Sequence, residues 1–207
     1  MTKLFDKITG TITSYDSGGI TDSSASFKAD YYKDWFVTLG GIEYKITSNT
    51  ATTLSFENSI SSNLDYSIEF LGRTFLTELE SDCANTTKVP DALIEKKYNQ
   101  ANNDIHNKIF AYLRGYYKGT YDPLVNIFNL IVMQQSFGYY VLSKIYQDLM
   151  IDQDSFESFK GYNMYEKSYI EGVKDSLALL QLDINSDSTI DAKEKAESAS
   201  VYSFLTR

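Results

Sequence analysis

The sequence predicts an α+β protein in which a small all-β barrel or sandwich module is followed by an antiparallel helical bundle. Apolar residues alternate with polar ones through the first seventy or so residues, which is the period of a half-buried strand. After Asn85 the apolar spacing shifts toward 3.6, the period of a helix. With 207 residues, 43% of them hydrophobic, the chain is long enough to bury a sizeable core. We therefore expect a β module at 1–75, a polar linker at 76–87, a bundle at 88–182 and a terminal loop and helix at 183–207.

A hairpin around Gly40-Gly41 is the clearest part of the β module. Two strand-like runs flank this pair, and a tight type I′ or II′ turn needs the positive φ that glycine adopts without steric cost. Pairing across the turn predicts an inward face made of Trp35, Val37, Leu39, Ile42, Tyr44 and Ile46. The other face then carries Phe36, Thr38, Glu43 and Lys45.

Further strands are expected at 7–15, 52–57 and 65–70, where Ile8, Leu54 and Ile68 begin or continue the same alternation. Five or six short strands at this spacing are typical of a small barrel or sandwich.

Three helices are expected in the second half of the chain. The first runs from Lys88 to Gly115 with Pro90 in its first turn, where a missing N–H costs nothing. The second runs from Pro123 to Leu149, and a capping box of Asp154 and Glu157 opens the third. The expected apolar stripes of the first and third helices are Ile94, Tyr98, Ala101, Ile105, Ile109 and Leu113, and Tyr162, Tyr165, Tyr169, Val173, Leu177 and Leu180.

The charge of the chain argues against sequence-specific nucleic-acid binding. Its net charge is −9, and a protein that reads DNA normally presents a basic patch with arginine side chains, which are scarce here. The single Cys83 excludes an internal disulfide. No secretory signal opens the sequence, and the most apolar run, Leu124 to Met133, is too short to span a bilayer. We expect a protein without membrane spans that is made in the cytoplasm.

Catalytic motifs are not evident, so we expect that the protein is not an enzyme. The only histidine, His106, lies on the first helix, where such a residue is usually part of the surface or the packing. Paired carboxylates for acid–base chemistry stay possible. The 17 tyrosines admit three interpretations: a sugar-stacking platform, a subunit interface, or a bias of composition.

Residues 183–194, DINSDSTIDAKE, have the spacing of a calcium-binding EF-hand loop. Oxygen ligands are expected from Asp183, Asn185, Asp187, the Thr189 carbonyl, Asp191 and a bidentate Glu194. Ser188 stands at the sixth position, where such loops prefer glycine for its positive φ. We expect a structural Ca²⁺ that holds the last helix; alternatively, Asp191 and Glu194 form a capping box without metal.

The helical part resembles the head–tail connector proteins of tailed bacteriophages. The resemblance rests on residues 89–117, VPDALIEKKYNQANNDIHNKIFAYLRGYY, on the apolar second helix, and on 165–183, YEKSYIEGVKDSLALLQLD. Tyr112, Leu113, Arg114 and Tyr116 match a short stretch that ends the family's first helix. Tyr169, Val173, Leu177 and Leu180 match the pattern of its third. The family's compact members lack a β module such as the one expected here.

The resemblance implies a structural protein of the virion, located at the head–tail junction and assembled in the host cytoplasm. It implies a homo-oligomeric ring of roughly twelve copies below the portal protein, in contact with other neck and tail ring proteins. DNA would pass through the ring without sequence-specific binding, and an acidic channel would not retain its phosphates. The alternative is a calcium-dependent surface or carbohydrate-binding module, with the β part as the recognition domain.

Overall fold

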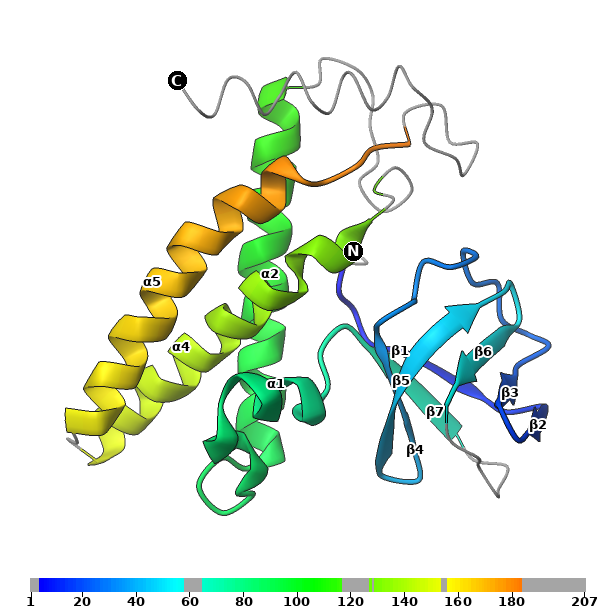
Figure 1. The fold of residues 1–207 in the computed structure, drawn as a ribbon, viewed down its shortest axis with the longest axis horizontal. Coiled ribbons are helices and arrows are strands. Elements are labelled where there is room, and N and C mark those ends of the chain that lie inside the picture. The colour runs from blue at the N-terminus through cyan, green and yellow to red at the C-terminus, as the bar shows by residue number, and fades with distance from the viewer. Residues whose placement is uncertain (1–3, 58–64, 117–126, 128, 154–155, 184–207) are drawn as a thin grey trace. The chain divides into compact units, whose positions relative to one another are not determined.

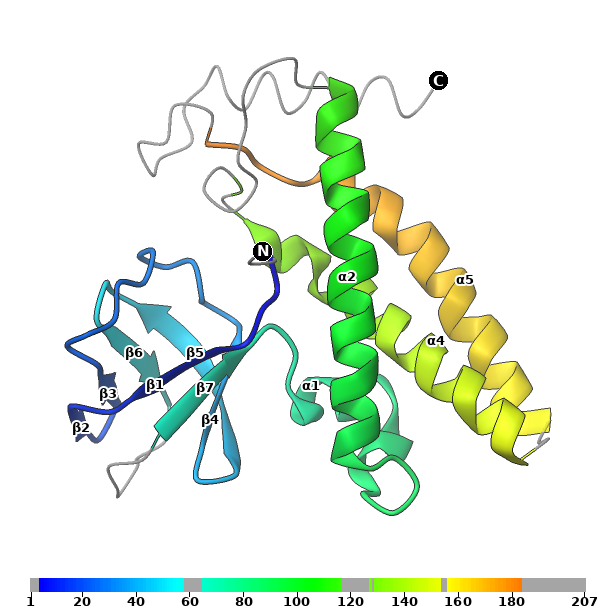
Figure 2. The same cartoon turned by 180° about the vertical axis from the view of Figure 1, so that it is seen from behind.

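The computed structural model describes residues 4–57, 65–116, 127, 129–153 and 156–183, and it confirms the α+β class (Figures 1 and 2). The chain divides into two compact units. The β unit comprises Phe5–Phe75, and the helical unit begins at Leu76 and also includes Leu4. The boundary falls inside a short helix, α1 (Arg73–Leu79).

The β unit is one antiparallel sheet of seven described strands, where five or six were expected. The strands are β1 (Ile8–Thr11), β2 (Ser14–Asp16), β3 (Gly19–Thr21), β4 (Phe36–Leu39), β5 (Ile42–Asn49), β6 (Thr53–Phe56) and β7 (Asp65–Glu69). Their order in the sheet is β1-β7-β4-β5-β6-β3-β2.

The sheet must be rolled, because its two edge strands are neighbours in the sequence. Only Ile12 and Thr13 separate β1 from β2, although these strands form opposite edges. Six inter-strand gaps of about 4.8 Å would place the edges of a flat sheet roughly 29 Å apart, whereas three extended residues span at most about 11 Å. A bulge in β5 between Ile46 and Ser48 supplies a bend. The result is a small barrel-like unit.

The predicted hairpin forms with the predicted register. Gly40 and Gly41 have φ of 56° and 84°, which fits a type I′ turn, and Val37 lies opposite Tyr44. Two side chains differ from expectation. Ile42, expected inside, is 59% exposed because it stands at the tip of the hairpin, and Phe36, expected outside, is buried beside Phe75.

Among its described residues the helical unit contains three long helices, α2 (Asp91–Tyr116), α4 (Gln134–Gln153) and α5 (Phe156–Ala178). Helices α4 and α5 form an antiparallel pair, and α2 packs against α4 (Figures 1 and 2). Ring contacts join the helices, as between Tyr98 and Phe137, whose centroids are 5.1 Å apart. Most of the predicted stripe positions are buried: Tyr98, Ala101, Ile105, Ile109, Leu113, Tyr165, Tyr169, Val173 and Leu180.

The second helix begins later than the sequence suggested. A 3₁₀ turn, η2 (Leu130–Met133), precedes α4, and residues 123–126 lie outside the described residues. Asn129 has a non-helical backbone, with φ −122° and ψ 56°. Its side chain donates to the Leu179 carbonyl at 3.0 Å and accepts from the Gln181 amide at 2.6 Å. These bonds to a distant segment replace the helical continuation that local sequence favours.

The segment expected as a linker, 76–87, is structured. It holds the end of α1 and a 3₁₀ helix, η1 (Ser81–Ala84), and both Leu76 and Cys83 are buried. These two buried residues are surrounded in the sequence by polar ones, so no apolar pattern is visible there. The carboxylates of Glu80 and Asp82 accept hydrogen bonds from Tyr165 and Tyr146 of the helical unit. The segment belongs to the helical unit, and the two units divide between Phe75 and Leu76, where the β module was expected to end.

Candidate functional site

The predicted calcium ligands fall mostly outside the described residues. Asp183 is described and is buried, directly after Leu182, which forms a β-bridge with Ile127. The other predicted ligands, Asn185, Asp187, Thr189, Asp191 and Glu194, lie beyond the described part of the chain. Within the part that is described, no group of three or more His, Cys, Asp or Glu side chains is arranged to hold a metal. The calcium site stays a prediction.

The single histidine lies in the core of the helical unit. His106 is buried on α2, and its Nδ1 accepts a hydrogen bond of 3.2 Å from the backbone N–H of Leu4. Its ring also contacts Phe110, with centroids 4.5 Å apart. Accepting at Nδ1 requires the neutral tautomer with its proton on Nε2. The imidazole therefore ties the start of the chain to α2.

Several tyrosines pair with carboxylates, which bears on the excess of this residue. In the helical unit Tyr165 donates to Glu80 at 2.7 Å and Tyr146 donates to Asp82 at 3.1 Å. Tyr140 donates to the carboxylate of Asp104 on α2. In the β unit Tyr66 donates to Asp22 at 2.8 Å. Each ring fills apolar space while its hydroxyl is satisfied, so these tyrosines are structural.

Burial and pairing shift the protonation of these groups. Burial, with added contributions from the nearby carboxylates, raises the pKa of Tyr66, Tyr146 and Tyr165 well above the ordinary value. The pKa of Asp82 is lowered, first by its hydrogen bond with Lys88 and then by that with Tyr146. The pKa of Asp22 is lowered by its hydrogen bonds with the Ser24 side chain and with Tyr66.

Helix α5 carries three of the six exposed large apolar side chains of the described residues. Phe159, Met164 and Ile170 are each about half exposed, and Leu179 follows directly after the helix. Phe159 and Ile170 are separated by about three helical turns and therefore lie on the same side of α5. We call this pair the α5 face. The sequence alone does not distinguish this pair, because Phe159 and Ile170 lie next to the apolar stripe of the helix and could equally belong to its buried side.

Charges of both signs are interspersed along α5. The helix holds three lysines and four carboxylates, and its net charge of −1 over 23 residues is the average charge density of the chain, −9 over 207. Lysine and acid side chains alternate along it, as in the exposed pair Lys167 and Glu171 at 3.8 Å. The α5 face is thus an exposed apolar pair on a helix that presents both lysines and carboxylates.

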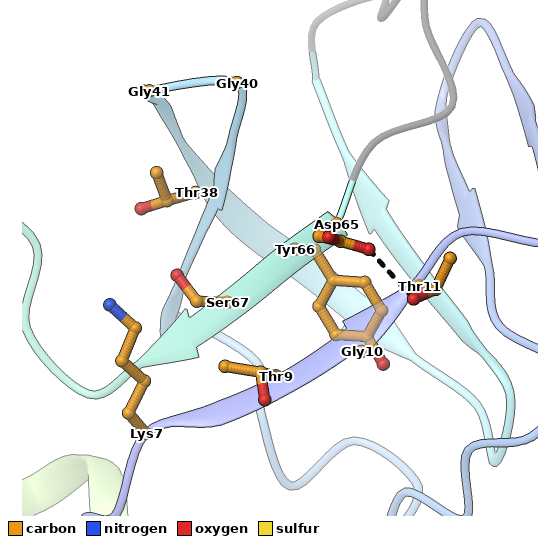
Figure 3. Close-up of a pocket in the computed structure, with 10 residues that line it drawn as sticks. All are labelled: Lys7, Thr9, Gly10, Thr11, Thr38, Gly40, Gly41, Asp65, Tyr66 and Ser67. Carbon is orange, nitrogen blue, oxygen red and sulfur yellow. Dashed lines mark hydrogen bonds between the residues drawn. The ribbon is translucent and has the colours of Figure 1, made fainter.

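A hollow of about 590 Å³ on the β unit is the second candidate (Figure 3). Strands β1, β4 and β7 and the hairpin turn line it with Lys7, Thr9, Gly10, Thr11, Thr38, Gly40, Gly41, Asp65, Tyr66 and Ser67. Most of its side chains are hydroxylic. Alternation in the strands predicts this outward face, but only the sheet order places β1 and β4 on either side of β7.

Comparisons with family models, with curated proteins and with solved structures find no match to this chain. Within the described helices, none is long and apolar enough to cross a membrane.

Proposed function

We propose that this chain is a structural virion protein, a head–tail connector that forms a ring below the portal through which DNA passes. The observation that carries the proposal is the α5 face, an exposed apolar pair on a helix with alternating lysine and acid side chains. The resemblance to connectors spans Lys88 to Leu182 and so includes all of α5.

The expected occupant of the α5 face is a second copy of the chain. Lysines and carboxylates alternate along α5, so a second copy can place lysines opposite carboxylates at this contact. Burial of two large apolar side chains favours association at that place. Repetition of one heterologous contact around a closed axis produces a ring.

Mass photometry of the purified chain, alone and with the portal protein of the same virus, tests the proposal. We expect ring-sized particles at least in the presence of portal, and their loss in the double variant Phe159→Ser, Ile170→Ser. Met164→Ser is the matched control, because Met164 is equally exposed but lies about 140° around the helix from Phe159. Rings that persist in the double variant, or a chain that stays monomeric with portal, would contradict the proposal.

Location in the particle provides an independent test. Mass spectrometry of purified virions should detect the chain in a small, fixed number of copies relative to the portal. Its absence from virions would overturn the connector proposal whatever its behaviour in solution.

The calcium prediction is tested separately. We expect one Ca²⁺ to bind the loop from Asp183 to Glu194, and Glu194→Gln to weaken binding about tenfold or more, since it removes the bidentate ligand. Isothermal titration calorimetry measures both, with Glu171→Gln, an exposed carboxylate of α5, as the control. If Glu194→Gln binds Ca²⁺ as tightly as the unchanged chain, the loop is not a calcium site and Glu194 only forms the capping box with Asp191.

A further inference from the structure

Three hydroxyl side chains form a straight row across the floor of the β-unit hollow. Thr9 of β1 lies directly opposite Ser67 of β7, and Ser67 lies directly opposite Thr38 of β4. Directly paired residues project to the same side of a sheet, and Figure 3 shows these side chains together in the hollow. Neighbouring strands are about 4.8 Å apart, so the row extends over roughly 10 Å. We call it the hydroxyl row.

The hydroxyl row is available for a ligand. Among the described residues, none forms a hydrogen bond with the side chains of Thr9, Thr38 or Ser67, and all three are at least partly exposed. Each hydroxyl donates one hydrogen bond and accepts up to two. The row therefore offers alternating donor and acceptor capacity at a regular spacing.

The charged groups beside the row are already paired. On one side of the row, along β1 and β7, Lys7 forms an ion pair of 2.5 Å with Glu69, and on the other side Thr11 donates to Asp65 at 2.9 Å. An anionic polymer would find no free cation here and would be repelled by the Asp65 carboxylate. The floor between the two pairs is uncharged. These features favour a neutral, polyhydroxylated ligand.

We propose that the hydroxyl row binds a neutral β-1,4-linked oligosaccharide that lies across β1, β7 and β4. In an extended β-1,4-linked chain the sugar units repeat at nearly the spacing of adjacent strands, so successive units can each meet one hydroxyl of the row. An α-1,4-linked chain coils and loses this register. The turn at Gly40 and Gly41 borders the hollow and limits the ligand on that side. This binding is independent of ring formation by α5.

Saturation-transfer NMR and calorimetry on the full-length chain test the proposal with cellohexaose, chitohexaose and maltohexaose as probes. We expect saturable binding in the millimolar range for at least one β-1,4-linked probe, because the contacts are hydrogen bonds and the one aromatic ring of the described lining, Tyr66, is buried and does not offer a stacking surface. Affinity for maltohexaose should be at least tenfold lower.

Variants locate the binding to the row. Thr9→Val and Thr38→Val each remove one hydroxyl with little change of shape and should weaken binding severalfold, and the double variant should abolish it. Thr47→Val is the matched control, because Thr47 is an exposed threonine of β5 outside the hollow. Circular dichroism verifies that each variant is folded. Absence of saturable binding by both β-1,4-linked probes, or equal binding by the double variant, would overturn the proposal.

Discussion

Gly161 shows how a single residue sets the approach of two helices. A Cβ atom added at this position of α5 would lie 2.6 Å from a ring carbon of Tyr146 on α4. The ring has little freedom to retreat, because it stacks near Tyr165 with centroids 5.6 Å apart and its hydroxyl binds Asp82. The absence of a side chain therefore permits the α4–α5 contact.

We predict that Gly161→Ala destabilises the helical unit although alanine is the better helix former. Helix propensity favours alanine by about 1 kcal/mol, and overpacking of a fixed ring costs about 1–3 kcal/mol. The expected net loss is about 1 kcal/mol in the free energy of unfolding, measured by urea denaturation. Gly172→Ala is the control, since its nearest neighbour is the Ser136 hydroxyl at 3.1 Å. A Gly161→Ala variant at least as stable as the natural chain would show that the ring moves aside.

At the scale of elements, one ion pair fixes α2 against α4. Lys97 is buried on α2, and its Nζ lies 2.7 Å from the Asp148 carboxylate, which is 29% exposed. The exposed Lys96 also approaches Asp148, at 3.7 Å. A buried ammonium is tolerated only while its partner is present. The two partners should therefore respond differently to replacement.

We predict that Asp148→Ala costs more stability than Lys97→Met. The first leaves a buried ammonium without its carboxylate, and we expect a loss of about 2 kcal/mol, less than for a fully buried pair because Asp148 is partly exposed. The second places an apolar chain of similar length in a buried site and leaves Asp148, which is partly exposed, beside Lys96, so it should be nearly neutral. Thermal and urea unfolding of both variants measure the difference. Equal losses would mean that Lys97 reaches solvent after its partner is removed.

For the whole molecule, the hydrogen-bonded carboxylates of Asp22 and Asp82 limit the stability of the fold at low pH. The pKa values of Asp22 and Asp82 in the folded protein lie below the ordinary 3.8. Their stabilising contribution is therefore complete above pH 3.8 and is lost as the pH falls through the lowered pKa values.

The buried tyrosines limit the stability of the fold at high pH, because their pKa values are raised where those of the carboxylates are lowered. Their pKa values in the folded protein lie above the ordinary 10.0, so the stabilisation is present below pH 10.0 and is lost as the pH rises beyond it. We predict a melting temperature that falls on both sides, measured between about pH 2 and 12. Tyrosinate absorbance should rise together with unfolding at the alkaline end. Full ionisation of the tyrosines near pH 10 in a folded chain would contradict this prediction.

The boundary between the units leads to a prediction about fragments. A fragment that begins at Leu76 keeps Glu80 and Asp82, the acceptors of Tyr165 and Tyr146, whereas one that begins at Lys88 loses them. Loss of two hydrogen bonds to charged groups costs on the order of 3 kcal/mol. We predict helical, cooperative unfolding for the fragment from Leu76 and a melting temperature lower by roughly 10 °C for the shorter one. Identical melting curves would assign 76–87 no role in the helical unit.

Features that depend on neighbouring residues could be predicted from the sequence alone. Alternation gave most of the strands, the Gly40-Gly41 pair gave the hairpin and its register, and the 3.6 spacing gave the buried side of α2. It also provided the connector resemblance and the calcium loop, which remain predictions. These features follow from backbone sterics and from the periodicity of burial, which act over a few residues.

Only the tertiary structure decided the features that depend on residues distant in the sequence. It ended the helical pattern at Asn129, whose amide binds the backbone beyond α5, and it buried Phe36 beside Phe75. It gave the carboxylates of 76–87 their tyrosine partners. It also aligned Thr9, Thr38 and Ser67, because pairing of β1 and β4 with β7 joins strands from three separate parts of the chain. Local propensity contains no information about such partners, so both candidate surfaces emerged only when the elements were packed.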